Sequence, residues 1–401
     1  VKRCEYDFAS GTVTVEVDEG RAWHLQTTGL KRTRPSFVRD RVHFSPGQKY
    51  SVRAAEDTYR DLYGSGLFKR VAVNFSPSDS GATVHVAVEE QNSLLLKLGY
   101  RWDDEYHSEG FAEALENNMF GIGVVAFGRA RIAERRKRYS AGMKTDRFFR
   151  TYVAFDLQAY GAKYDRRLFL PDGTERGLRD EDRIGASFRL AQQIARFGAV
   201  SAGTRIESVE TFSRADSTRE DYELRALKLS SLVEDLDRTY FPNDGRRNHF
   251  SFESAGKVFG GVTEYNKWYF SIEHYFPLGS RLNVRPRFVG ATSSAGLPAA
   301  ERFYIGGLDS FEGLRTEEVS GAKVLLVNLQ VRYQVYPRTF LIARYNSGNT
   351  YEQTEDVSLE NVRSGWAALA GFDSIGGPII FGYGRANGDR DRFYFNAGLR
   401  F

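Results

Sequence analysis

The sequence predicts a mostly β protein, most of which is a transmembrane antiparallel β-barrel of about sixteen strands. Three observations predict this fold: segments that alternate apolar and polar residues, connections that alternate in length, and aromatic residues near the segment ends. The chain has 401 residues, of which 41% are hydrophobic, 14% aromatic and 27% charged. Its mean hydropathy of -0.46 is too low for a bundle of membrane helices.

The segment VLLVNLQVRYQV shows the alternation most clearly. One face carries Leu325, Val327, Leu329, Val331, Tyr333 and Val335, and the other carries Leu326, Asn328, Gln330, Arg332 and Gln334. A period of two indicates a strand with one apolar and one polar face. The last segment repeats the pattern, with its apolar face formed by Phe393, Phe395, Ala397, Leu399 and Phe401. A soluble β-sandwich would show the same alternation.

The number of segments and their connections favour a barrel over a sandwich. Residues 92–401 contain about sixteen such segments, each near the roughly 9 to 11 residues that a tilted strand needs to cross a bilayer. Tight turns such as MFGIG, LGS and YPR alternate with long charged loops such as LPDGTERGLRDED, SRADSTRED and NTYEQTEDVSLEN. Short turns on one side and long loops on the other are typical of outer-membrane barrels. Aromatic residues near the segment ends, such as Trp268, Tyr269, Tyr275 and Phe276, suit the two membrane interfaces.

Residues 21–91 predict a small separate α+β domain. AWHLQTTGL has the pattern of a strand, PSFVRDRVHF and VRAAEDTYRDLYGSGLF have helical spacing, and KRVAVNFSPSDSGATVHVAVEEQ is typical of a hairpin. In the second helix the expected apolar stripe is Ala54, Ala55, Tyr59 and Leu62, and Gly64 and Gly66 end the helix. An exposed sheet edge in such a domain can accept an extended peptide as an added strand. The plainer alternative is a spacer.

The phrase TYRDLYGSGLFKRVAVNF resembles the second helix and following strand of a POTRA domain. The residues that carry this resemblance are Tyr59, Leu62, Tyr63, Gly66 and Phe68. One POTRA domain before a sixteen-stranded barrel is similar, over nearly the whole chain, to the bacterial surface-antigen superfamily of outer-membrane assembly and translocation proteins. The segment DLDRTYFPNDGRRNHFSF, similar to the family's Phe-Pro turn before a barrel strand, and the terminal Phe401 support the resemblance.

Residues 295–323, which include YIGGLDSFEGLRTEEVSGAK, interrupt the regular strands with a polar, glycine-rich loop. A lumen sixteen strands wide would conduct solutes unless it were filled, so we predict that this loop is an internal plug. The resemblance implies the same, because the family's sixth outer loop folds into the lumen. There the family presents an arginine, a glycine and an aromatic residue to acidic residues of the wall.

The loop tip departs from the family pattern. It reads Phe311, Glu312, Gly313, Leu314 and Arg315, with an acid where the family has arginine and a leucine where it has an aromatic residue. One alternative is that Glu312 pairs with a basic wall, for which the inward-facing candidates are Arg285, Arg287 and Arg332. The other is that Arg315 takes over the role and pairs with Asp373, in a segment GFDSIG that resembles the family's acidic wall motif.

Residues 1–20 include GTVTVEVDEG, which has the pattern of a strand for which we expect no upstream partner. The strand is similar to the one that closes a preceding POTRA domain, so we expect the natural protein to continue towards its N-terminus. The ending FDSIGGPIIFGYGRANGDRDRFYFNAGLRF most resembles the branch of the family that carries an N-terminal patatin-like lipase.

Motifs for chemistry are missing from the sequence. It has no Gly-x-Ser-x-Gly, no His-Glu-x-x-His and no P-loop, so we expect no catalytic residue, metal or cofactor. The single Cys4 excludes an internal disulfide, and a net charge of +4 argues against nucleic acid. The paired glycines of GIGVVAFG and GYGRANG lie in strand hairpins, where small residues relieve crowding on the inner wall.

The resemblance implies a non-enzymatic outer-membrane protein with its POTRA domain in the periplasm, most like the transporter part of a patatin-like type V secreted protein. A general insertase and a structural anchor or passive pore are the alternatives. The expected partners are an unfolded or passenger polypeptide, lipid and lipopolysaccharide, and the machinery that inserts the barrel, with a homodimer left open. The run ERRKRY (134–139) is expected in an outer loop, where its basic residues either neutralise lipid phosphates or are simply solvated.

Overall fold

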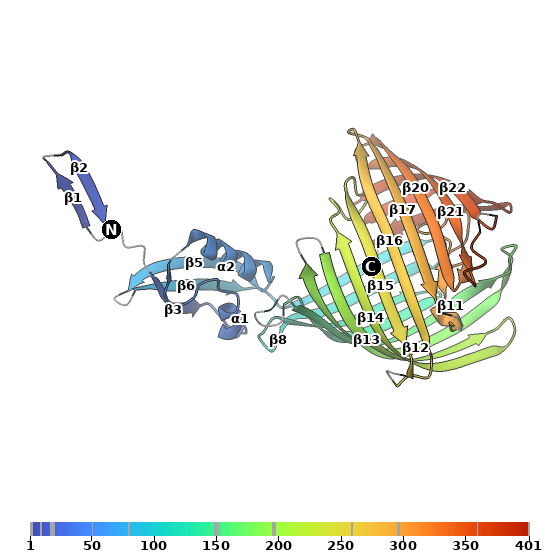
Figure 1. The fold of residues 1–401 in the computed structure, drawn as a ribbon, viewed down its shortest axis with the longest axis horizontal. Helices are drawn as coiled ribbons and strands as arrows, with labels where there is room; N and C mark the ends of the chain where they lie inside the picture. The colour runs from blue at the N-terminus through green and yellow to red at the C-terminus, as the bar shows by residue number, and fades with distance from the viewer. Residues whose placement is uncertain are drawn as a thin grey trace. The chain divides into compact units, whose positions relative to one another are not determined.

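The computed structural model separates into two compact units, one of them the barrel shown in Figure 1. The first unit consists of Val1–Leu95, Leu115–Ala126 and Arg147–Thr151, and the second of Leu96–Ala114, Phe127–Asp146 and Tyr152–Phe401. The structure describes residues 3–8, 10–16, 21–49, 51–78, 81–147, 151, 153–194, 198–257, 260–294, 297–358 and 360–399.

Most of the chain, from β7 to β24, forms a closed barrel of sixteen strands, as predicted. Every strand follows its neighbour along the chain, and β24 returns to β7 to close the sheet. The strands are β7 (Leu94–Asp103), β8 (His107–Met119), β9 (Val124–Ala133), β10 (Arg136–Thr145), β11 (Val153–Phe169), β12 (Glu175–Ile194), β13 (Gly198–Ser213), β14 (Thr218–Glu234), β15 (Gly245–Ala255), β16 (Tyr265–Leu278), β17 (Leu282–Ser293), β20 (Lys323–Tyr336), β21 (Thr339–Tyr351), β22 (Arg363–Ser374), β23 (Gly377–Ala386) and β24 (Arg390–Gly398). The sandwich alternative is therefore wrong.

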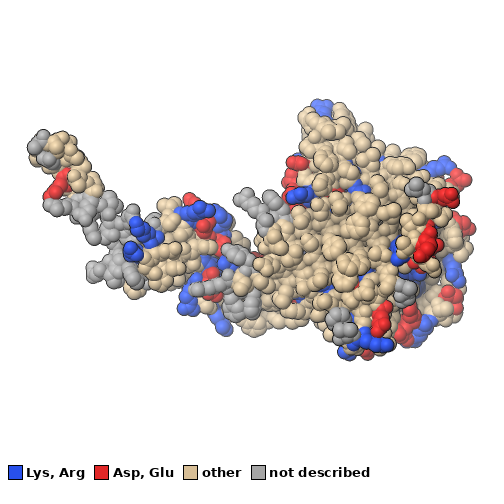
Figure 2. Space-filling model, in the orientation of Figure 1, with Lys and Arg blue, Asp and Glu red and all other residues tan. Residues whose placement is uncertain are grey.

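The two faces of β20 confirm the alternation. Leu325, Val327 and Leu329 are exposed on the outside of the barrel, whereas Asn328, Gln330 and Arg332 are each 4% exposed and point into the lumen. The visible outer face of the barrel is largely free of charged side chains, which gather at the strand ends (Figure 2). An apolar outside and a polar inside are what a barrel in a bilayer requires.

We call the end of the barrel at which the chain enters β7 the near end, and the opposite end the far end. The far-end loops were predicted to be longer than they are. Of LPDGTERGLRDED only 170–174 lie between strands, and of SRADSTRED only 214–217. Strands β11 to β14 have 16 to 20 residues and continue through these charged segments. Ion pairs between neighbouring strands, such as Arg219 of β14 to Glu210 of β13 at 3.3 Å, help to extend the hairpins.

The first unit contains a four-stranded sheet in the order β4-β3-β6-β5 with two helices. Its elements are β3 (Arg21–Thr28), α1 (Pro35–Arg39), β4 (Gln48–Lys49), α2 (Val52–Gly64), β5 (Phe68–Ser78) and β6 (Gly81–Glu90). The predicted order of strand, helix, helix, strand and strand is observed, with β4 in addition. Helix α1 is shorter than PSFVRDRVHF, because Val42 and Phe44 pack against the core from extended chain.

The inward face of helix α2 includes Ala54, Ala55 and Leu62 of the predicted stripe but not Tyr59. Leu62 is fully buried, as is Phe68 on β5, but Tyr59 and Tyr63 are 45% and 51% exposed and stack on each other. Thr58 lies inside instead, because its hydroxyl donates to Ala54 O and accepts from His43 N. The helix ends as predicted at Gly64, and Gly66 follows with a φ of 70°.

Residues 3–16 form a separate hairpin. Strand β1 (Arg3–Asp7) pairs with β2 (Thr12–Glu16), so the expectation that the second strand has no upstream partner is wrong. Gly11, with a φ of 64°, makes the tight turn. Residues 17–20, the end of the predicted closing strand, lie outside the described residues.

Among the described residues, no helix is long and apolar enough to cross a membrane.

Candidate functional site

The loop that joins β17 to β20 fills part of the lumen, and we call its described residues 297–322 the lumen loop. It contains a short 3-10 helix (Ala299–Glu301) and two strands, β18 (Phe303–Ile305) and β19 (Val319–Gly321), that pair only with each other. Phe311 and Leu314 at its tip are fully buried. Of the predicted plug at 295–323, residues 295 and 296 are not described, and Lys323 already belongs to β20.

The carboxylate of Glu312 is held by two side chains of β21. Arg344 donates Nη1 to Oε1 over 2.6 Å, and Asn346 donates its amide to Oε2. Glu312 is 2% exposed and Asn346 is fully buried. Each carboxylate oxygen therefore has its own donor, which is the geometry that a buried charge needs.

Glycines allow the loop tip to lie directly against the backbone of the wall. Gly313 has a φ of 92°, and a Cβ there would lie 2.3 Å from Ala386 N. On the wall, a Cβ at Gly365 would lie 2.5 Å from Glu312 O, and one at Gly384 would lie 3.1 Å from Gly313 N. Gly384 belongs to GYGRANG, whose glycines were expected to relieve crowding. A larger residue at any of these positions would displace the tip.

Tyr394 on β24 also holds the loop tip. Its hydroxyl accepts a hydrogen bond from Gly313 N at 2.8 Å and donates one to Leu314 O at 2.9 Å. Tyr394 is 3% exposed, so these bonds lie in a site shielded from solvent. The tip is thus fixed to β21, β22, β23 and β24 together.

Other acids of the lumen loop also meet basic wall residues. Glu301, which is 4% exposed, lies 2.8 Å from Arg183, 3.1 Å from Arg205 and 3.1 Å from Lys267. Towards the end of the loop, Glu318 lies 2.7 Å from Arg390, and Glu317 pairs with Arg166. These acids of the loop therefore meet basic side chains of the wall, which is the reverse of the arrangement that the family resemblance implies.

The predicted partners of Glu312 lie elsewhere in the lumen. Arg285 and Arg287 are 3.5 Å and 3.8 Å from Glu273, and Arg332 donates to Pro242 O at 2.7 Å. The cation that holds Glu312 is Arg344 of β21, which was not among the predicted partners. Sequence reasoning also missed Glu301, because its three partners become neighbours only through the register of β12, β13 and β16.

Arg315 and Asp373 are not brought together. The Arg315 side chain is 44% exposed and lies 3.8 Å from Glu175, at the far end of β12. Asp373 pairs with Pro378 beside the turn between β22 and β23, at the near end. The reversed ion pair, and not Arg315, is therefore the interaction that the structure shows at the tip.

A second segment enters the lumen from the near end. It is the turn 235–244, which contains the Phe-Pro motif and joins β14 to β15. Asp237 accepts hydrogen bonds from the backbone N–H groups of Asn243 and Asp244, which fixes the turn. Phe241 then stacks on Phe340 of β21 with ring centroids 4.7 Å apart.

Strands β24 and β7 close the barrel with little pairing, and we call this junction the seam. Only three positions pair among the described residues, whereas β13 and β14 pair at sixteen. The paired positions are Asn396 with Asp103, Ala397 with Trp102, and Gly398 with Arg101. Residues 94–98 of β7 are all exposed. The seam is therefore the weakest junction between barrel strands for which pairing is described.

The predicted C-terminal residues lie at the seam. Phe393 and Phe395 of β24 are 77% and 39% exposed on the outer face, and Phe395 packs edge-on against Trp102 of β7. Leu399 follows the end of β24, and Phe401 lies outside the described residues.

The basic run at 134–139 is not an outer loop. Glu134 and Arg135 form the turn, and β10 begins at Arg136. Arg135 pairs with Glu105, and Arg136 lies 2.6 Å from Glu109, which is 1% exposed. These two arginines therefore pair with acidic residues of the barrel. Among the described residues, no group of three or more His, Cys, Asp or Glu side chains could hold a metal ion.

Comparison with known proteins gives the family and the fold. Residues 13–401 match the family model of the Omp85 superfamily domain. The outer membrane protein assembly factor BamA of Nitratidesulfovibrio vulgaris is 21% identical over 359 residues, which is 83% of this chain and 44% of that protein. The chain thus spans less than half the length of this relative.

Solved structures show the same fold at low identity. BamA from Haemophilus ducreyi lacking POTRA domains 1-3 superposes with a TM-score of 0.85 at 14% identity, over 100% of this chain and 89% of that one. CdiB from Acinetobacter baumannii and from Escherichia coli give TM-scores of 0.63 and 0.65 at 13% and 15% identity. They cover 95% and 99% of this chain and 74% and 79% of their own.

Proposed function

Because this chain belongs to the Omp85 superfamily, we propose that it assembles polypeptides into the bacterial outer membrane and that clients meet it at the seam. The observation that carries this proposal is the short pairing of β24 with β7. A strand without a partner leaves backbone N–H and C=O groups unsatisfied, which is costly next to lipid. A client strand that adds to β7 would satisfy these groups.

The side chains of β7 suit the same role. Leu96, Leu98 and Tyr100 are 63%, 70% and 58% exposed and alternate on one face. An apolar strand edge that faces lipid can template a client strand whose own outer face is apolar. The chain itself then needs no catalytic group, in keeping with a non-enzymatic role.

The first unit suits the capture of clients before insertion. We assign it as a POTRA domain in the periplasm, from the order of its elements and the sequence resemblance. Strand β5 is an edge of its sheet, has 11 residues and pairs only with β6 among the described strands. An extended polypeptide can add to such an edge through backbone hydrogen bonds.

The test is a disulfide across the seam. Trp102→Cys and Ala397→Cys replace directly paired residues, in a Cys4→Ala background, and Val331→Cys with Ala343→Cys does the same in the long β20–β21 pair as a matched control. In proteoliposomes, oxidation should stop the conversion of an unfolded barrel client to its heat-modifiable form, and reduction should restore it. The control pair should assemble the client when oxidised. Unchanged assembly with the seam oxidised would refute the proposal.

A second candidate is translocation of a passenger through the lumen, as in type V secretion. One observation favours it: among the described strands, β18 and β19 pair only with each other, and no barrel strand adds to them. The loop can therefore leave the wall as one unit. This candidate requires the loop to be displaced, whereas assembly at the seam does not. A passive pore is disfavoured because the loop occupies part of the lumen and is held to the wall by buried ion pairs.

A further inference from the structure

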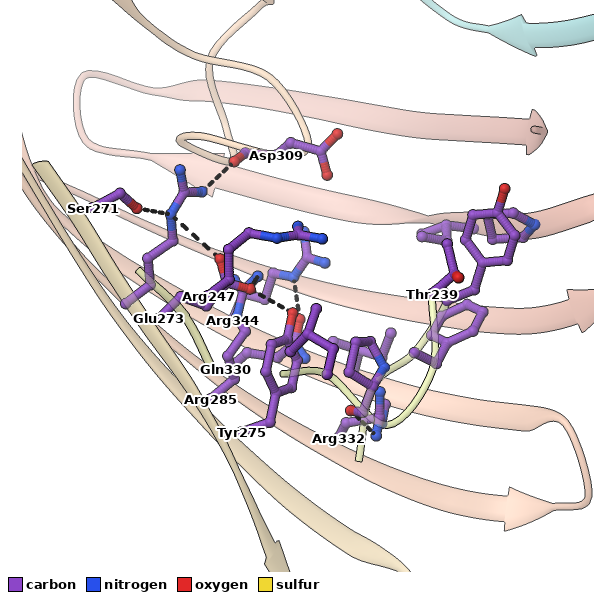
Figure 3. A pocket seen from close by; sticks show the side chains of 18 of the residues that line it. Thr239, Arg247, Ser271, Glu273, Tyr275, Arg285, Asp309, Gln330, Arg332 and Arg344 are labelled. Carbon is purple, nitrogen blue, oxygen red and sulfur yellow. Dashed lines mark hydrogen bonds and ion pairs between the residues drawn. The ribbon is translucent and has the colours of Figure 1, made fainter. Parts of the chain in front are cut away.

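A polar cavity of about 480 Å³ lies in the barrel beside the lumen loop and the turn 235–244 (Figure 3). Five arginines from four wall strands line it, together with two acidic residues, Glu273 and Asp309. The arginines are Arg247, Arg285, Arg287, Arg332 and Arg344. The cavity is therefore strongly basic, with five arginines against two acidic residues.

Two of the arginines are neutralised by carboxylates outside the cavity lining. Arg247 lies 2.7 Å from Glu234, and Arg344 lies 2.6 Å from Glu312. The other three arginines have weaker ion pairs or none. Glu273 is 3.5 Å from Arg285 and 3.8 Å from Arg287, both longer than a strong charge-assisted hydrogen bond. Arg287 also donates to the backbone oxygen of Asp309 at 2.9 Å.

Arg332 is the least compensated cation of the cavity. It is 4% exposed, donates to Pro242 O at 2.7 Å and lies 5.0 Å from the ring centre of Phe340. No carboxylate of a described residue forms an ion pair with it. Nearby, Nε of Arg285 is buried and has no hydrogen-bond partner within the described part of the chain. A buried guanidinium without a counter-ion is unfavourable, so the site is suited to an anion.

The strand register places these three groups next to one another. Asn283 pairs with Arg332 and Arg285 pairs with Gln330, so Arg332 is a diagonal neighbour of Arg285 across β17 and β20. Arg287 is the next inward residue on β17. Figure 3 shows Arg285 and Arg332 among the side chains that line the cavity.

We propose that this cavity binds a phosphate group, with Arg285, Arg287 and Arg332 as its ligands. A phosphate offers several oxygens in different directions and can therefore accept from guanidinium groups on two strands at once. The aromatic rings of Tyr240, Tyr269 and Tyr275 line the remaining space and can cover an organic group attached to the phosphate. Residues of the turn 235–244 also line the cavity.

Calorimetry on the full chain in detergent tests the site with inorganic phosphate as the probe, at constant chloride. Wild type should bind saturably with one site per chain, and Arg332→Gln should bind about tenfold more weakly, as expected for the loss of one charge-assisted hydrogen bond. The matched control is Arg246→Gln, which removes one positive charge from β15 outside the cavity lining, where Arg246 lies 3.3 Å from Asp235. It should bind like wild type.

An absence of saturable binding to wild type, or equal binding by Arg332→Gln, would overturn the proposal. If Arg332→Gln loses heat-modifiable mobility and so does not fold, Arg285→Gln replaces it, with the same expected weakening. Glycerol 3-phosphate and vesicles of phosphatidylcholine with or without phosphatidic acid then separate the sources of the phosphate. Competition by the soluble ester indicates a free metabolite, and competition only by phosphatidic acid indicates a lipid. Tighter competition by polyglutamate than by either would show an acidic polypeptide site and contradict the phosphate assignment.

Discussion

Glu312 is the buried acid at the tip of the lumen loop. Its carboxylate is buried and is matched by one guanidinium and one amide, both on β21. The removal of one partner from such a pair leaves the other charge uncompensated, at a cost of about 3–5 kcal/mol. A surface pair such as Arg315 with Glu175, at 3.8 Å and half exposed, contributes far less.

Glu312→Ala should therefore release the loop tip and raise single-channel conductance in planar bilayers. Arg315→Ala is the control and should leave conductance unchanged. The double change Glu312→Arg with Arg344→Glu keeps the pair with its charges exchanged and should restore part of the closure. The interpretation fails if Arg315→Ala opens the channel and Glu312→Ala does not.

Gly365 tests the fit between the tip and the wall without changing any charge. A Cβ there would lie 2.5 Å from Glu312 O, whereas at Gly110 it would meet nothing within 4 Å. Gly365→Ala should lower stability by about 1–3 kcal/mol through overpacking, and Gly110→Ala should not. The measurement is the temperature at which each variant loses its folded mobility on a gel. Equal temperatures for both variants would mean that the tip is not seated on β22.

Glu90 gives the first unit a predictable response to acid. Burial raises its pKa, but hydrogen bonds from the backbone N–H groups of Thr33, Lys31 and Arg32 outweigh burial and hold the pKa below the ordinary 4.5. The stabilisation is therefore complete above pH 4.5 and is lost as the pH falls through the folded-state pKa. Glu90→Gln should reduce amide-exchange protection of residues 31–33 at pH 7 and weaken its acid dependence. Glu89→Gln, on an exposed side chain 3.7 Å from Arg70, should do neither.

At the scale of elements, the sequence was most informative where one face of a strand is apolar and lies on the outside of the barrel and the other is polar and lies in the lumen. The period of two in β20 predicted both of its faces, and the number of such segments predicted the closed barrel. The lengths of the far-end strands were underestimated. Their charged ends have the composition of a loop, and the ion pairs between strands that extend them cannot be predicted from the sequence. The partner of Glu312 could not be predicted either. Arg344 becomes a neighbour of the tip only when the loop has folded back, and alternation along a strand contains no information on that path.

The first unit should be separable from the barrel in function. Deletion of residues 21–90 removes the sheet β4-β3-β6-β5 and both helices but none of the paired positions of the seam. The shortened protein should therefore still insert and keep its heat-modifiable mobility, while client assembly falls. Undiminished assembly would reduce this unit to a spacer.

On the scale of the whole molecule, the lumen loop is held to the wall by many ion pairs, whereas the seam is held by few backbone pairs. Acids of the lumen loop meet basic residues on six strands of the wall, β11, β12, β13, β16, β21 and β24. The seam, by contrast, has three paired positions among the described residues. Since a closed sheet owes its stability to continuous pairing, the seam is where a client strand gains most by joining it.

Client assembly, measured with either the seam or the lumen loop fixed by a disulfide, tests this account most directly. One protein carries the seam cysteines at positions 102 and 397, and the other carries Ser310→Cys with Asn328→Cys, which joins the loop to β20 where Asn328 donates to Ser310 O at 2.9 Å. After oxidation, the account predicts that the seam clamp abolishes assembly of an unfolded barrel client and that the loop clamp leaves it intact. Assembly that survives the seam clamp and stops with the loop clamp would contradict the account and place the client's path in the lumen.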